Sequence, residues 1–207
     1  MTDNVHDMTK YLAERTARIL AEDAADRARV RMTRFLVASG VPLGKGDDVL
    51  LATGKYLATD ATRAVDRWLA SDDKPALMLC GGVGVGKTFA AAVALMRTRG
   101  TFCRAADLPR RVEPWRGEET ADRLDLDVPL IVLDDLGAEG EAQHRFGSAL
   151  FRVVDERQTA GRLLITTNLP RAGIRERYDA RVVDRLNACC VAFELRGESM
   201  RPKSGGL

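Results

Sequence analysis

Short apolar runs and longer amphipathic stretches alternate along most of this chain. Each apolar run is bounded by glycine, proline or polar residues, as expected of strands buried on both faces of a parallel sheet. We expect five strands, at residues 77–80, 101–104, 130–133, 163–168 and 189–195. Between them, apolar residues at helical spacing predict helices at 89–97, 105–112, 142–160 and 171–186. This order predicts a three-layer α/β domain with a central five-stranded parallel sheet.

The first 70 residues carry helical patterns and no strand pattern. Residues 4–38 read as one or two helices, with a charged, alanine-rich middle that has little to bury. The sequence SGVP at 39–42 ends this region, and a second helical pattern follows at 47–70. We therefore divide the chain into a helical extension, residues 1–38, and a domain, residues 39–207. The extension either packs on the domain or docks a partner protein, and the sequence favours neither.

A glycine-rich loop, GGVGVGKT at residues 81–88, joins a predicted strand to a predicted helix. Its spacing is the Walker A pattern, in which glycines let backbone N–H groups point at phosphate oxygens. Lys87 can reach the β- and γ-phosphates, where we expect its side chain to be exposed until phosphate arrives, and Thr88 can offer its hydroxyl to Mg²⁺. We predict ATP binding by Gly81, Gly82, Val83, Gly84, Val85, Gly86, Lys87, Thr88 and Phe89.

Two carboxylates follow the apolar run at 130–133, and together they form a Walker B pattern. The carboxyl ends of parallel strands are where open α/β sheets place ligands. Asp134 is predicted to hold Mg²⁺ directly or through water, together with Thr88. Asp135 occupies the place of the carboxylate that polarises the attacking water. Asn168, at the end of the next predicted strand, would lie beside Asp135 and orient that water without adding charge.

Composition narrows the alternatives further. The formal net charge of +2 does not by itself argue for nucleic acid. Four cysteines stand in or beside apolar runs without a CxxC pair, and the two histidines are far apart, so we expect reduced thiols and no zinc site. No apolar run approaches the length of a membrane span, and no signal peptide is recognised. We therefore expect a cytoplasmic protein.

The least regular stretch, residues 112–127, holds basic residues around one aromatic. Such a loop can grip single-stranded DNA by phosphate pairing and base stacking. The alternative is a surface loop whose tryptophan folds back on the core, and acidic residues within the loop favour that alternative. The candidate DNA-binding residues are Arg110, Arg111, Trp115 and Arg116.

Together these parts resemble an AAA+ ATPase of the DnaC/IstB group, from about Ser39 to Arg201. The segments that carry the resemblance are SGVP, GGVGVGKT, LIVLDDLG, LLITTNLP, YDARVVDRL and GESMR. The resemblance makes Asn168 the sensor 1 residue and Arg201 the sensor 2 residue. It implies that Arg181 or Arg185 acts as the arginine finger of a neighbouring subunit, in a head-to-tail homo-oligomer. It also implies that no separate C-terminal lid domain is present.

The resemblance implies an ATP-dependent helicase loader that binds ATP·Mg²⁺ and single-stranded DNA and delivers a replicative helicase. The runner-up is an IstB-type helper of a transposase, and residues 39–201 do not separate the two. A third interpretation is a nucleotide-gated DNA-binding protein with little turnover. Asp135 stands where many relatives have glutamate, so we expect slow ATP hydrolysis that assembly or DNA stimulates.

Overall fold

The structure is a computed structural model that describes residues 2–42, 58–113, 122–140, 143–197 and 199. The predicted helix at 47–70 is described only from residue 58, so residues 47–57 lie outside the described residues. The same holds for Trp115, Arg116 and Arg201 among the predicted site residues.

The predicted five-stranded parallel sheet is confirmed. Its strands run in the order β2-β3-β4-β1-β5, and every neighbouring pair is parallel. The order places β1, which precedes the glycine-rich loop, directly beside β4. The strands are β1 (Ala76–Gly81), β2 (Thr101–Arg104), β3 (Leu130–Leu136), β4 (Arg162–Thr167) and β5 (Cys190–Leu195).

The helices also follow the predicted order, with one difference. The single helix predicted at 171–186 is two helices, because the backbone is extended at Tyr178 and Asp179. The Asp179 side chain accepts a hydrogen bond from the N–H of Val182 and caps the second helix. The helical segments are α1 (Thr2–Ala38), α3 (Asp60–Leu69), α4 (Lys87–Thr98), the 3₁₀ turn η1 (Ala105–Asp107), α5 (Leu108–Val112), α6 (Gln143–Glu156), α7 (Arg171–Arg177) and α8 (Ala180–Cys189).

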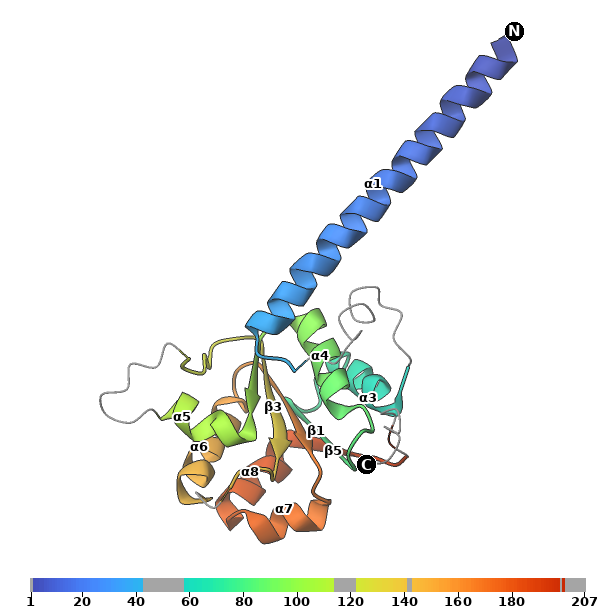
Figure 1. The fold of residues 1–207 in the computed structure, drawn as a ribbon. Helices are drawn as coiled ribbons and strands as arrows, with labels where there is room; N and C mark the ends of the chain where they lie inside the picture. Colours follow the sequence, from blue (N-terminus) through green and yellow to red (C-terminus); the bar gives the residue numbers. More distant parts are fainter. Residues whose placement is uncertain (1, 43–57, 114–121, 141–142, 198, 200–207) are drawn as a thin grey trace, which may run out of the picture.

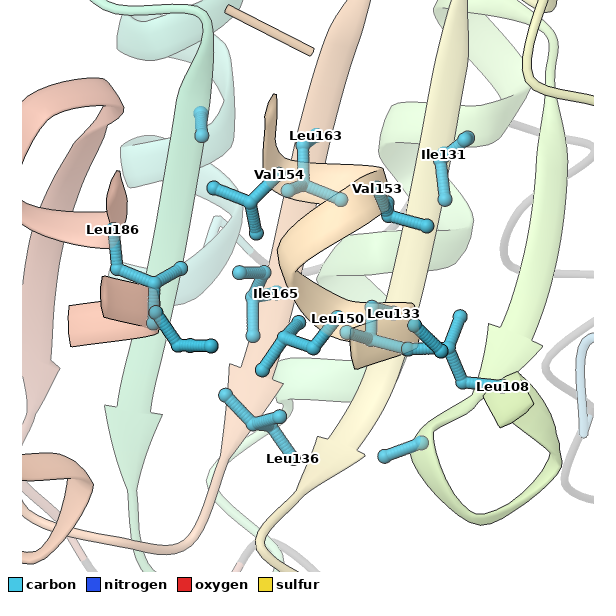
Figure 2. Packing of buried hydrophobic residues seen from close by; sticks show 14 of the residues in the cluster. Leu108, Ile131, Leu133, Leu136, Leu150, Val153, Val154, Leu163, Ile165 and Leu186 are labelled. Carbon is cyan, nitrogen blue, oxygen red and sulfur yellow. The ribbon is translucent and has the colours of Figure 1, made fainter. Parts of the chain in front are cut away.

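Helices cover both faces of the sheet and make three layers (Figure 1). Successive residues of a strand point to opposite faces, so Met78 packs with α6 and α8 whereas Leu79 packs with α3 and α4. Figure 2 shows Leu150, Val153 and Val154 of α6 lying against Leu163 and Ile165 of β4. Burial on both faces explains why the strands read as continuous apolar runs.

The N-terminal helix α1 projects away from the three layers as one long rod (Figure 1). Its C-terminal end is attached to the domain, because Leu36 is fully buried and the Arg99 guanidinium lies 4.5 Å from the ring centre of Phe35. Residues 14–34 are largely exposed, so α1 does not pack on the domain along its length. Among the described residues, no helix is both long enough and apolar enough to span a membrane.

Candidate functional site

The glycine-rich loop connects the carboxyl end of β1 to the first residue of α4. Gly84 and Gly86 have φ angles of +85° and +87°, in the left-handed region that favours glycine. A Cβ atom on Gly84 would also lie 2.0 Å from the Oγ of Ser199. The loop leads into the N-terminus of α4, whose backbone N–H groups and partial positive charge favour an anion. The loop therefore has the shape that phosphate binding requires.

Lys87 is the first residue of α4, and its side chain crosses the loop. Its ammonium group donates to the carbonyls of Gly81 (2.8 Å) and Gly82 (2.7 Å), and to Oδ1 of Asn168 (2.8 Å). Only 6% of the residue is exposed. The expectation that Lys87 is exposed was therefore wrong: oxygen atoms of the loop and of β4's end surround the charge. Asn168, which was predicted to lie beside Asp135, accepts a hydrogen bond from Lys87.

Asp134 is buried near the end of β3, between two threonine hydroxyls. Thr88 Oγ1 lies 3.1 Å from Oδ1 and 3.3 Å from Oδ2, and Thr166 Oγ1 donates to Oδ1 at 2.6 Å. Burial raises the pKa of Asp134, while the hydrogen bond from Thr166 acts in the opposite direction. The structure thus joins the Thr88 hydroxyl and the Asp134 carboxylate, which the sequence placed 46 residues apart.

Those two groups fit a magnesium ion. Mg²⁺ prefers hard oxygen ligands and is usually held by one or two carboxylates together with substrate phosphates and water. Thr88 and Asp134 supply a hydroxyl and a carboxylate beside the phosphate-binding loop. When bound, the ion would neutralise charge on the phosphate oxygens.

Asp135 differs sharply from its neighbour. Its side chain is exposed, and its φ angle is +58°, which is unusual for a residue other than glycine. The register between β3 and β4 shifts here, since Leu133 pairs with Ile165 and Leu136 pairs with Thr167. Two residues of β3 thus face one of β4, which is a β-bulge. The bulge lets two consecutive acids occupy the carboxyl end of one strand.

Glu139 follows the bulge and ties it to the junction of α7 and α8. Its carboxylate accepts hydrogen bonds from the N–H of Gly137, the Nε of Arg177 and the hydroxyl of Tyr178. Burial and the bond to Glu139 raise the pKa of Tyr178. Because Glu139 is 6% exposed and held by three donors, it links two elements of the fold. The spacing of motifs in the sequence carried no signal for this link.

The two candidate finger arginines lie on α8, and the guanidinium groups of both lie over the ring of Phe151. Arg185 pairs with Asp155 of α6 (Nε to Oδ1, 3.4 Å) and is partly exposed. The exposed Arg181 lies over the ring of Phe151, with its guanidinium carbon 4.8 Å from the ring centre. Both arginines contact residues of α6. We call the surface formed by Arg181, Arg185 and α6 the arginine face; the glycine-rich loop is not part of it.

The candidate DNA-binding arginines on α5 also differ from one another. Arg111 turns inward: its Nη1 donates to the carbonyl of Phe102 (2.7 Å), and its Nε donates to the carbonyl of Asp122 (3.1 Å). Its side chain is 14% exposed, whereas that of Arg110 is 57% exposed. These contacts join Phe102 of β2 to Asp122. Arg111 therefore has a structural role in the folded chain.

Comparison with known proteins identifies the family. The sequence profile of the family described as "IstB-like ATP binding protein" matches residues 2–205. The chain belongs to this family. The predicted resemblance to the DnaC/IstB group of AAA+ ATPases is therefore confirmed, and ATP binding is the shared property that the family description states. The match includes α1 as well as the α/β domain.

Two solved structures of DnaA, each with a TM-score above 0.5, share the fold. Similar chains include DnaI, at 24% identity and a TM-score of 0.49, covering 70% of this chain and 87% of that one. AMPPCP-bound DnaA from Aquifex aeolicus is 18% identical with a TM-score of 0.54, covering 68% and 49%. DnaA bound to AMPPCP and single-stranded DNA is 16% identical with a TM-score of 0.51, covering 70% and 50%. This chain thus spans about half the length of these DnaA chains. Among curated proteins, none matches.

Proposed function

We propose that this protein is an ATPase whose ATP-bound state assembles head-to-tail on single-stranded DNA and delivers a partner protein to it. The observation that carries the proposal is the convergence of Lys87, Thr88, Asp134 and Asn168 on the glycine-rich loop. These side chains can bind phosphate, hold Mg²⁺ or orient water, which are the tasks of a site for phosphoryl transfer. The family binds ATP.

Each residue of the site has a separate role in the proposed reaction. Lys87 binds the β- and γ-phosphates by exchanging contacts with loop carbonyls for contacts with phosphate oxygens. Thr88 and Asp134 are the residues that would hold Mg²⁺. Asp135 accepts the proton of the attacking water, and Asn168 orients that water. The side chain of Asp135 is exposed, so water can reach its carboxylate.

Arg181 is proposed as the residue that completes a neighbour's site. Both arginines lie over the ring of Phe151, but Arg185 also pairs with Asp155 on its own chain, whereas Arg181 is the more exposed of the two. An exposed cation–π contact contributes only about 0.5–1 kcal/mol, so Arg181 can leave it at small cost. A contact between Arg181 of one copy and the phosphates of the next is head-to-tail and generates a ring or a helix. Arg201 is proposed as the sensor arginine on the strength of the GESMR motif.

The proposed partner is a replicative helicase. The extended α1, about 55 Å long at 1.5 Å per residue, offers a surface well separated from the nucleotide site. The choice of a helicase as the partner rests on the resemblance of the motifs to the DnaC/IstB group. A second candidate, a helper of a transposase, is favoured by the IstB-like description of the matched family.

The test uses purified full-length chain with the replicative helicase and the transposase of its host. A helicase loader should place the helicase on closed circular single-stranded DNA only when ATP and Mg²⁺ are present, and Asp134→Ala should abolish this. Stimulation of strand transfer by the transposase, without helicase loading, would establish the second candidate. Loading that is equally efficient without nucleotide would contradict the proposal.

A further inference from the structure

Thr166 stands opposite the bulge that carries the two Walker B acids. Its side chain is fully buried in β4. Its Oγ1 donates to Oδ1 of Asp134 at 2.6 Å and accepts the backbone N–H of Asp135 at 3.0 Å. One hydroxyl therefore touches both consecutive acids, one through its side chain and the other through its backbone.

We propose that Thr166 is a positioning residue that sets the Asp134 carboxylate for Mg²⁺ and holds the bulge that presents Asp135. The inference rests on the proposed ATP·Mg²⁺ function and deepens it. A bulge leaves one residue without its regular ladder partner, and here that residue's N–H bonds to the Thr166 hydroxyl. The same hydroxyl then has one proton to donate, and it goes to Asp134.

The chemistry of this position is demanding. The group must accept and donate at the same time, and it must fit a fully buried place on a strand. Threonine and serine meet both requirements, whereas valine has nearly the same shape but can neither donate nor accept a hydrogen bond. Removing the hydroxyl would leave the N–H of Asp135 unsatisfied at φ +58°, and Asp134 would keep only the hydroxyl of Thr88 as a side-chain donor among those described.

The next residue provides a matched control. Thr167 is equally buried, donates to the carbonyl of Leu136 at 2.6 Å and accepts the N–H of Leu169 at 3.0 Å. Thr167→Val therefore removes the same group, with the same number of hydrogen bonds, from the same strand. It leaves the contacts of Asp134 and Asp135 in place.

The experiment measures binding of a fluorescent, non-hydrolysable ATP analogue to the full chain while MgCl₂ is titrated. Groups that orient a metal ligand typically change metal affinity by about 10–100-fold when removed. We expect Thr166→Val to raise the half-saturating Mg²⁺ concentration by about that factor. Thr166→Ser should restore the wild-type value, and Thr167→Val should retain it. Thermal melting followed by circular dichroism compares the stability of the two valine variants.

Each outcome decides a different claim. If Thr166→Val titrates like the wild type, or if Thr167→Val shifts as far, the positioning role is wrong. If the wild type itself binds the analogue without any dependence on Mg²⁺ or Lys87, the proposed function is wrong. Should Thr166→Val fail to fold, Thr166→Cys replaces it, because a thiol is a weaker donor and acceptor than a hydroxyl. Its Mg²⁺ requirement should then exceed that of Thr166→Ser, and equality would overturn the inference.

Discussion

The nucleotide edge of the sheet and the arginine face of α6 and α8 are built in opposite ways. At the nucleotide edge, Lys87 and Asp134 are buried and held by short hydrogen bonds from three separate segments. On the arginine face, Arg181 and Arg185 lie at the surface against an aromatic ring and a single carboxylate. Surface contacts of this kind contribute little to folding.

This difference separates what one chain can do from what an assembly must do. The buried groups of the nucleotide edge are preorganised, so a single copy should bind ATP. The arginines are not held in one geometry by their own chain, so they are available to a second copy. The comparison predicts that changes at the nucleotide edge abolish function in every copy, whereas changes on the arginine face can be complemented.

The largest effect is expected for Lys87→Ala. It removes the cation that binds the phosphates, so ATP binding should become undetectable by isothermal titration calorimetry. The variant also leaves the carbonyls of Gly81 and Gly82 without their donor, which should lower stability by about 1–3 kcal/mol. Lys74→Ala, at the opposite end of β1, is the control and should bind ATP normally. Tight ATP binding by Lys87→Ala would contradict the site.

An effect nearly as large is expected for Arg181→Ala in the assembled state. Arginines supplied by a neighbour raise phosphoryl transfer by about 10³–10⁵-fold, so Arg181→Ala alone should lose most of its DNA-stimulated phosphate release. Mixing it with Lys87→Ala should restore part of the activity, because the second protein donates its arginine to the first protein's intact loop. Arg185→Ala should lose less.

The mixing experiment also tests whether the arginine face acts between chains. Absence of recovery, with co-assembly shown by crosslinking, would mean that the arginine face acts within its own chain. Recovery with Arg185→Ala but not with Arg181→Ala would exchange the roles of the two residues.

A smaller effect is expected for Asp135→Asn. The carboxamide cannot accept a proton, and loss of general base catalysis costs about 10²–10⁴-fold in rate. Binding should be preserved, because the phosphate contacts lie elsewhere. Single-turnover phosphate release and nucleotide affinity, measured beside the exposed control Asp73→Asn, separate the two effects. Unchanged turnover would remove Asp135 from the mechanism.

The sequence predicted the fold and most of the nucleotide edge because those features are local. A strand, a glycine loop and a helix are contiguous from Ala76 to Thr98, and Asp134 and Asp135 end an apolar run. The burial of Lys87 and the role of Thr166 depend on which strands are neighbours and in what register. The sequence contains no direct record of that register, so the contacts of Thr166 with the two acids could not be predicted.

The arginine face was predicted less well for the same reason. The helical pattern at 171–186 contained both arginines but gave no sign of the break at Tyr178 or of the buried Glu139 that fixes it. In the sequence, Asp179 and Asp184 are acidic neighbours of the two arginines. The structure instead pairs Arg185 with Asp155, because α6 packs against α8.

The smallest effect is expected for Arg110 of α5 and for Arg116 in the segment that follows it. The Arg110 side chain is 57% exposed, so it resembles the surface arginines of α8. We expect Arg110 and Arg116 to contact DNA phosphates, while Arg111 stays committed to the carbonyls of Phe102 and Asp122. Each lost contact with a single strand should reduce the log–log slope of affinity against salt by about 0.7, so Arg110→Ala with Arg116→Ala should reduce it by about 1.4.

Fluorescence anisotropy with a labelled single-stranded oligonucleotide, measured at several salt concentrations, gives this slope. Arg18→Ala is the control, because Arg18 is an exposed arginine far along α1 and its loss changes the net charge without touching the loop. Arg111→Ala is a second comparison: it should lower the melting temperature more than the double variant does, since its guanidinium is mostly buried and bonded to the backbone. An unaltered slope in the double variant would mean that this loop is a surface connection, and that DNA is bound by another part of the assembly.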